Sequence, residues 1–303
     1  MSDRELRNEQ LRSFFTAPVI VSGAILLAII VCSVFAPLLA PFDPNAVDLK
    51  SVLSPPSPEH WLGTDKTGRD LFSRLLFGSR TTILSAVCIV GISAAIGIPL
   101  GLISGFFGRF ADKVISRVCD ILLSFPSLLL AFVLVAVFGR GITTVVIALG
   151  ILYVPMLTKL TRSMTLVEKN KVYVEAANSI GFSSGHILFR EILPCILSTL
   201  VVQMMLDVGY AVLDLSAMSF LGLGVTPPTA DWGAMLEEGR TLIAAYPALA
   251  LAPGLMIVLT VVAVNTFGDG LNAFLNPSQR KLPSKRRFLR MVWRQESLEG
   301  IAR

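Results

Sequence analysis

The chain has 303 residues, 53% of them hydrophobic, with a mean hydropathy of +0.71 and a formal net charge of +5. This composition excludes a water-soluble globular protein, because the apolar residues gather in six long stretches. A helix needs ~20 apolar residues to cross a hydrocarbon core of ~30 Å. We therefore predict an all-α integral membrane protein with six transmembrane helices, at about 18–36, 82–106, 119–139, 142–158, 196–222 and 248–268.

Lys and Arg residues are unevenly distributed between the two sides of this layout. The two termini and the second and fourth loops between predicted spans contain 19 of the 26 cations. Because loops rich in Lys and Arg remain in the cytoplasm, we predict an N-in/C-in orientation. The predicted organisation is a cytoplasmic arm (1–16), a first transmembrane helix (17–37), an external loop (38–81), a five-helix transmembrane domain (82–277) with a cytoplasmic loop at 159–195, and a basic cytoplasmic tail (278–303).

The basic tail and the absent motifs limit the functional classes. The tail sequence KLPSKRRFLRMVWR favours attraction to anionic lipid headgroups over binding of nucleic acid. The chain has no G-x-x-x-x-G-K-[ST] phosphate-binding loop. His60 and His186 lie on opposite sides of the membrane in this topology, so they cannot share a metal ion. We therefore predict a non-catalytic protein that binds no cofactor or metal itself.

The external loop contains the sequence HWLGTDKTGRDLFSR, whose glycines are typical of turns. Asp65, Arg69, Asp70 and Arg74 follow one another closely enough to form local ion pairs. We interpret this stretch as an ordered, charge-paired elbow that leads into the second span. Direct contact with a substrate is the alternative interpretation.

Small residues recur in the second predicted span. Gly97, Gly101 and Gly105 are spaced by four residues, which places them along one face of a helix. A face without side chains lets another backbone approach closely. The pattern therefore indicates helix packing and says little about substrate.

The long cytoplasmic loop predicts two short helices. The first covers Val172–Ile180, with Val174, Ala177 and Ile180 on or near one face. Gly181 permits a left-handed turn, and a serine at 183 or 184 can cap the second helix. That helix carries Ile187, Leu188 and Ile192 at near-helical spacing, and a proline follows where the chain re-enters the membrane. Such a hairpin is either an interfacial amphipathic element or a lever held by a soluble partner.

Two acids lie inside the fifth predicted span. Asp207 and Asp214 are seven residues apart and therefore lie almost on one helix face. A carboxylate at the centre of a membrane helix costs about 2.5–3.5 kcal/mol, so it must face a polar cavity or a partner. Two interpretations stay open: the acids line a translocation pathway suited to an amino group or a cation, or they form hydrogen bonds between subunits.

The cytoplasmic loop resembles the EAA loop of permeases from ABC importers. The residues that carry this resemblance are Glu175, Ala176, Ala177, Gly181, Leu193 and Pro194. Glu191 stands where the family pattern often has an aliphatic residue, but the spacing from the glycine to the proline is intact. In that family the loop docks into a cleft on the ATP-hydrolysing subunit. The resemblance implies that Glu175 makes a charged contact there, Ala177 permits close docking and Gly181 forms the turn.

Three further segments narrow the resemblance to one subunit type. Residues 60–83, 120–139 and 220–236 are similar to the C-type permease subunit of dipeptide and oligopeptide importers, within the peptide/nickel class. The first contains LGTDxxGRDxxSRxxxGxR, and the third, FLGLGVTPPTADWGAML, contains Trp232. The resemblance covers about residues 12–277. The chain departs from the pattern in having Ala230-Asp231 in place of Pro-Glu, and Asn272 and Asn276 in place of charged residues. These departures bear on the identity of the substrate more than on the family.

The resemblance implies a type I ABC-importer permease core in the bacterial cytoplasmic (inner) membrane. Its partners would be a homologous second permease, two ABC ATPase subunits, an extracytoplasmic solute-binding protein and the lipid bilayer, with no nucleic acid. ATP and Mg would bind to the ATPase subunits, which would carry out hydrolysis. The substrate would be a peptide or a related small solute, with nickel, glutathione or an opine as alternatives. An ion-gradient-driven secondary transporter or channel is the rival class.

Overall fold

The computed structural model describes residues 16–275, so the predicted basic tail and nearly all of the predicted cytoplasmic arm lie outside the described residues. Within that range the chain is helical, apart from loops and one isolated β-bridge. The elements are α2 (Ala17–Val34), α3 (Ala36–Leu39), α4 (Leu71–Phe107), α5 (Arg109–Leu123), α6 (Ser127–Phe138), α7 (Ile142–Glu168), α8 (Val172–Ile180), α9 (Ser184–His186), the π-helical turn η1 (Ile187–Ile192), α10 (Leu193–Phe220), α11 (Trp232–Arg240) and α12 (Ala248–Leu275).

Five helices of the described chain are long and apolar enough to cross a membrane. They are α2, α4, α7, the continuous helix 184–220 and α12. α5 and α6 meet the same requirement only as a pair, and they are bent by 89° at the break between them. Six spans result when the bent pair counts as one, which agrees with the predicted number.

The third predicted span (119–139) is therefore not one continuous helix. α5 ends at Leu123, and α6 begins only after Pro126. No side chain caps the start of α6. Proline lacks an amide donor and disfavours helical geometry at the residue before it, so the helix breaks here. A run of apolar residues continues through the break, and this is why hydropathy alone predicted an unbroken span.

Two other helices extend beyond their predicted spans. α4 begins at Leu71, well before the predicted start at 82. Asp70 accepts a hydrogen bond from the Ser73 amide at 2.8 Å and so caps the helix at this point. α7 continues to Glu168, past the predicted end at 158. In both cases the additional turns are more polar than the apolar run by which the span was predicted.

The glycines of the second span hold α4 against α7, as predicted. A Cβ atom on Gly101 would lie 2.5 Å from the Thr161 Cβ and 2.6 Å from the Thr158 carbonyl oxygen. A Cβ atom on Gly105 would lie 2.7 Å from the Thr165 Cβ. These distances leave no room for a side chain, so only glycine permits the two backbones to approach this closely.

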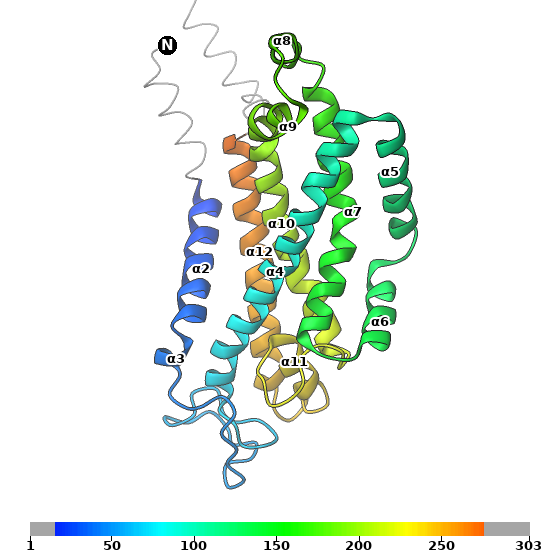
Figure 1. The fold of residues 1–303 in the computed structure, drawn as a ribbon. Helices are drawn as coiled ribbons and strands as arrows, with labels where there is room; N and C mark the ends of the chain where they lie inside the picture. The colour runs from blue at the N-terminus through cyan, green and yellow to red at the C-terminus, as the bar shows by residue number, and fades with distance from the viewer. Residues whose placement is uncertain (1–15, 276–303) are drawn as a thin grey trace, which may run out of the picture.

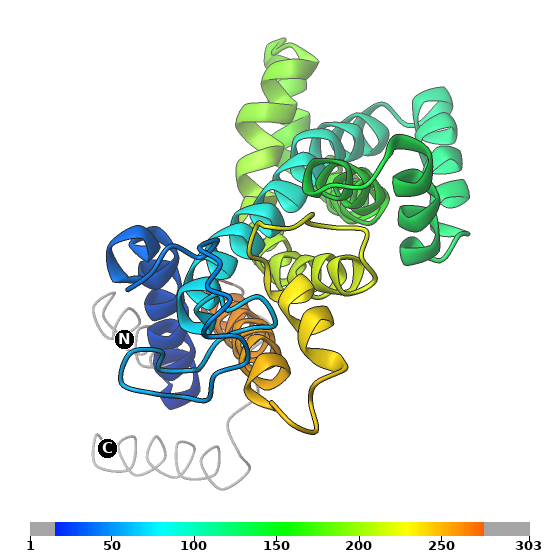
Figure 2. The ribbon, with the colours of Figure 1, turned by 90° about the horizontal axis from the view of Figure 1, so that it is seen from below.

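The long helices form one bundle with peripheral additions on two sides (Figures 1 and 2). α2 packs against α12 on one side, and α5 and α6 lie beside α7 on the other. α8 and α9 lie at one end of the bundle, together with the start of α2 and the end of α12. α3, α11 and the loop before α4 lie at the opposite end. The predicted cytoplasmic loop and both ends of the described chain therefore lie on the same side.

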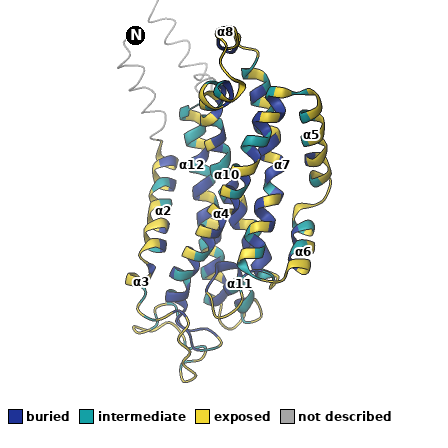
Figure 3. Cartoon of the chain, viewed as in Figure 1, coloured by how far each residue is buried: buried dark blue, intermediate teal, exposed yellow. Residues whose placement is uncertain are grey.

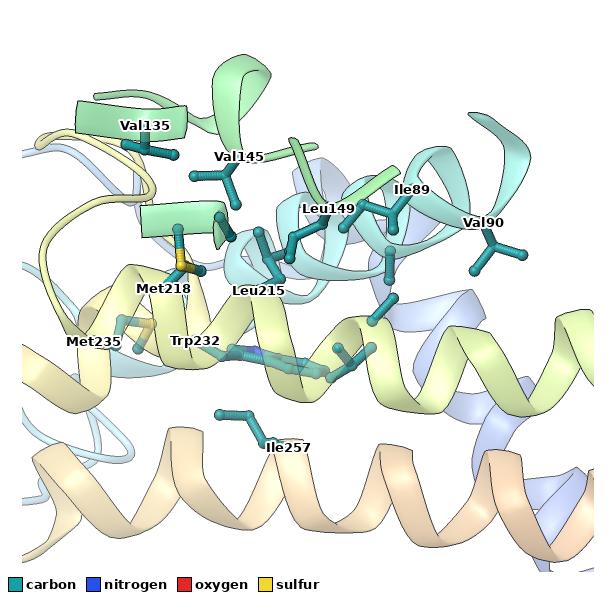
Figure 4. Packing of buried hydrophobic residues seen from close by; sticks show 14 of the residues in the cluster. Ile89, Val90, Val135, Val145, Leu149, Leu215, Met218, Trp232, Met235 and Ile257 are labelled. Carbon is teal, nitrogen blue, oxygen red and sulfur yellow. The ribbon is translucent and has the colours of Figure 1, made fainter. Parts of the chain in front are cut away.

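Two hydrophobic clusters form the interior of the described chain. The larger cluster joins α4, α7, α10 and α12 around Leu149, Leu215 and the fully buried Trp232 (Figure 4). The smaller one, centred on Leu157 and Ile192, lies toward the end that carries α8. Exposed residues follow the outer faces of α2, α5 and α6 (Figure 3). Many of them are large and apolar, as a surface in contact with lipid requires.

Candidate functional site

The cytoplasmic loop forms the predicted helical hairpin. α8 covers Val172–Ile180, the range expected from sequence. Gly181 has φ +91° and ψ +22°, a left-handed conformation that costs a residue with a side chain about 1–2 kcal/mol. Across this turn the Phe182 amide donates a hydrogen bond to the Ala177 carbonyl at 3.1 Å. Ser183 then accepts a hydrogen bond from the amide three residues later at 3.3 Å and so caps α9.

One face of α8 packs on the smaller hydrophobic cluster. Val174 is 1% exposed and Ala177 is 6% exposed, next to Leu188 and Ile192. The prediction that Ile180 lies near this face is wrong, since its side chain is 74% exposed. Each step of three residues falls about 60° short of a full helical turn, so Ile180 is rotated well away from Val174.

The six residues of the EAA-like pattern divide between exposed and buried positions. Glu175, Ala176, Gly181 and Pro194 are exposed, Leu193 is half-buried and Ala177 is buried. The role expected for Ala177, close docking of a partner, is therefore corrected. Its small side chain permits the hairpin to pack closely on its own bundle.

The second arm of the hairpin is continuous with a membrane span. α9 leads through the turn η1 directly into α10, so that residues 184–220 form one helix. Pro194 lies in the first turn of α10, directly after this wider π-helical turn. The sequence pattern had predicted a separate short helix here. The helix is instead unbroken from Ser184 to Phe220.

The tip of the hairpin exposes apolar side chains. Val172 is 80% exposed and Ile180 is 74% exposed. Phe182 is 44% exposed and stacks on the His186 ring, with 4.4 Å between the ring centroids. α8 projects beyond the ends of the long helices (Figure 1). The hairpin therefore presents exposed apolar side chains beyond the end of the bundle.

The two acids of the fifth span line one cavity, which is open on the side of α7 and α10 that faces α5 and α6. Its volume is about 350 Å³, and its lining comes from α5, α6, α7 and α10: Leu123, Ser127, Leu152, Tyr153, Met156, Asp207, Tyr210 and Asp214. Asp207 accepts a hydrogen bond from Gln203 Nε2 at 2.8 Å, and Asp214 accepts one from the Tyr153 hydroxyl at 2.7 Å. The predicted shared face is thus confirmed, and both acids have hydrogen-bond donors within this chain.

The charged elbow at the outer end is buried and extends to a distant helix. Arg69 Nε donates to Asp65 Oδ2 at 2.6 Å, and Arg69 Nη2 donates to Glu238 Oε2 at 3.0 Å. Arg74 lies 3.5 Å from both of these carboxylates. Burial alone would raise the pKa of the Asp65 carboxyl, but hydrogen bonds donated by Thr67 and Arg69 lower it below its usual value. The network therefore favours the ionised form of Asp65 and joins the elbow to α11.

Asp70 and Trp232 fix the outer ends of α4 and α11. Asp70 caps α4 and also lies 3.0 Å from His60 Nδ1. Asp231 caps α11 and accepts a hydrogen bond from the Thr82 hydroxyl at 2.7 Å. The indole of Trp232 is fully buried and donates to a backbone carbonyl of α4 at 3.0 Å. These residues hold the outer end together, and their burial leaves little surface for contact with a substrate.

Three of the residues that complete these sites were not predicted from the sequence. Glu238 lies 169 residues after Arg69, beyond the reach of any local pairing rule. Tyr153 reaches Asp214 from a different helix. Gln203 precedes Asp207 by one helical turn, and this polar residue in an apolar span was a signal that could have been used.

Two protein families and two known proteins that match this chain are all components of transport systems. Residues 97–281 match the family described as binding-protein-dependent transport system inner membrane component, and residues 17–56 match the N-terminal TM domain of oligopeptide transport permease C. The glutathione transport system permease protein GsiD of Pectobacterium atrosepticum is 41% identical over 85% of this chain and 86% of its own length. The probable D,D-dipeptide transport system permease protein DdpC of Escherichia coli is 42% identical over 85% and 87%.

A solved structure shares the fold. The MetNI methionine ABC transporter in inward-facing conformations matches with a TM-score of 0.54 and 18% identity. The match covers 68% of this chain and 97% of that chain. At this identity the likeness concerns the fold alone, and the predicted type I permease fold is confirmed.

Proposed function

The chain belongs to the family of inner membrane components of binding-protein-dependent transport systems, and, because it is thus a permease subunit of an ABC importer, we propose that it forms half of the translocation pathway for a small peptide. Two relatives at 41% and 42% identity are named for glutathione and for D,D-dipeptides, which are both small peptides. The apolar helices agree with a multi-pass inner membrane location.

The proposal assigns the remaining parts of the importer to partner chains. A homologous second permease completes the pathway, two ABC ATPase subunits bind and hydrolyse ATP with Mg, and an extracytoplasmic binding protein delivers the substrate. Among the described residues, no cluster of His, Cys, Asp and Glu has the geometry to hold a metal ion.

Coupling to the ATPase runs through α8 and the helix that follows it. The observation that carries this proposal is the unbroken helix of residues 184–220, which runs from the hairpin through the bundle. An ATPase that holds the exposed tip displaces this helix when it closes around ATP. Because Asp207 and Asp214 lie on the same helix, the displacement also moves the acids that line the cavity.

A substitution at the turn tests the coupling. Gly181→Val places a β-branched side chain at φ +91° and alters the angle between α8 and α9. We expect the complex with its partners to assemble, while peptide-stimulated ATP hydrolysis falls at least tenfold. Gly185→Val is the matched control, since a Cβ atom at Gly185 meets no atom within 4 Å and the position has no positive φ. Unchanged stimulation in Gly181→Val would reject this assignment of the hairpin.

The rival class is tested by omitting the partners. An ion-gradient-driven transporter moves substrate in liposomes that contain this chain alone. The importer requires the second permease, the ATPases, ATP and the binding protein. Peptide uptake by the chain alone, driven by a proton or sodium gradient, would refute the proposed function.

A further inference from the structure

The open cavity between α5, α6, α7 and α10 has an unusual balance of charge. Its lining contains two carboxylates, two tyrosines and one serine, and it contains no lysine or arginine. Neither Asp207 nor Asp214 forms an ion pair with any residue that the structure describes. The charged pairs of the described chain lie instead at the outer end, on α5 and α7, and around the hairpin.

Asp207 is the more deeply buried of the two acids. It is 8% exposed, and its Oδ1 atom accepts the hydrogen bond from Gln203. Within residues 16–275 its Oδ2 atom has no hydrogen-bond donor, although the residue lines the cavity. The Oδ2 atom is not fully buried, so it is accessible from the open cavity. A carboxylate in a membrane span without a cation beside it is costly unless this second oxygen meets water or another donor. The structure therefore leaves a place for a cationic donor in the cavity.

Asp214 repeats this arrangement farther along the helix. Its Oδ2 atom accepts a hydrogen bond from the Tyr153 hydroxyl, which orients the carboxylate without neutralising it. Seven residues of α-helix separate the two acids by about 10.5 Å along the axis. α10 runs from the hairpin end toward the outer end, so Asp214 lies nearer the outer end than Asp207. A substrate that enters from outside meets Asp214 first.

We infer that Asp214 and then Asp207 bind the protonated amino group of the substrate on its way through the cavity. A primary ammonium group supplies the positive charge and the hydrogen-bond donors that both carboxylates lack. The neutral donors Gln203 and Tyr153 hold the carboxylates in place without competing as cations. This inference rests on the proposed function and adds that the permease itself recognises the amino group.

Chemical protection tests the site without any knowledge of the natural substrate. The assembled complex is treated with dicyclohexylcarbodiimide, and modification of Asp207 and Asp214 is followed by mass spectrometry of the peptides. We expect methylammonium chloride to slow modification of both residues at least fivefold, whereas acetamide, which is similar in size and uncharged, has no effect. Asp269, an exposed carboxylate on α12 outside the cavity, is the internal reference. Equal effects of the two additives would overturn the inference.

Substitution then links the site to transport. Asp207→Asn and Asp214→Asn keep the size of the side chain and remove its charge, and we expect each to lower dipeptide uptake by the full complex at least tenfold. Asp269→Asn is expected to leave uptake unchanged. Uptake at the wild-type rate in both cavity variants would refute the inference, even if methylammonium protects. If no peptide stimulates the wild-type ATPase while methylammonium still protects, the peptide proposal fails and the ammonium site stands.

Discussion

The two ends of the bundle differ in which side chains find partners within this chain. At the outer end Arg69 and Arg74 are buried and share the carboxylates of Asp65 and Glu238. At the inner end, by contrast, the hairpin exposes Ile180 and other apolar side chains at its tip. The charged network of the outer end is therefore satisfied within one chain, although Leu49 and Trp61 are exposed there as well. For the inner end, the proposed function assigns the exposed tip to a contact with the ATPase. Substitutions at the outer end should change the stability of the chain, and substitutions at the inner end should change its partnership.

The largest effect is expected from Arg69→Ala at the outer end. Removing the guanidinium leaves Asp65 and Glu238 buried with one cation fewer, and breaking a buried pair in this way costs about 3–5 kcal/mol. We expect a strong loss of thermal stability of the purified chain in detergent. Arg80→Ala is the matched control, because Arg80 is exposed on the same helix, α4. Equal stability of the two variants would contradict the structural role of the network.

A smaller loss is expected where α4 and α7 meet between the two ends. Gly101→Ala forces a Cβ atom to within 2.5 Å of Thr161, and overpacking of this kind costs about 1–3 kcal/mol. Gly91→Ala on the same helix is the control, since a Cβ atom there meets no atom within 4 Å. Thermal unfolding of both variants in detergent measures the difference. The comparison predicts that Gly101→Ala impairs stability and coupling together, because it separates the helices that join the two ends.

The sequence predicts features that depend on neighbouring residues. Apolar length located the spans, and the order of Gly181 and Ser183 predicted where α8 ends and where α9 begins. The spacing of Gly97, Gly101 and Gly105 predicted a close helix contact, and the structure confirms it against α7. In each case the physical cause acts within a few residues along one helix or one turn.

Features that depend on distant residues were not predicted. The ion pair between Arg69 and Glu238 joins residues 169 positions apart, and no local pattern specifies which acid a buried arginine meets. The break before Pro126 was missed because hydropathy averages over a window and the apolar run continues through the break. The orientation of Ile180 was wrong because a spacing of three was taken for one face, although it drifts around the helix.

Loss of the cap at the hairpin should have a modest effect. Ser183→Ala removes the hydroxyl that accepts from the His186 amide, and loss of such a cap costs about 1 kcal/mol. Because the cap lies at the start of the helix that continues as α10, we expect fraying of α9 with little change in the free energy of global unfolding. Hydrogen exchange at the amides of residues 184–187 measures the fraying. Ser184→Ala is the control, and faster exchange in both variants would contradict the assignment of the cap to Ser183.

The smallest effect on the isolated chain is expected from Ile180→Ser at the tip of the hairpin. The side chain is 74% exposed and faces away from the buried side of α8, so its loss should change the stability of the chain by less than about 0.5 kcal/mol. If the tip is held by an ATPase, the same substitution removes apolar area from the contact and weakens the complex. Val174→Ser is the contrasting variant, because Val174 is 1% exposed and supports the hairpin from within. Co-purification of the ATPase subunits, compared with thermal stability of the permease alone, separates the two roles: Ile180→Ser should lower the first and spare the second, whereas Val174→Ser should lower both. An Ile180→Ser variant that retains its ATPases at the wild-type level would show that the inner end does not need a partner at this residue.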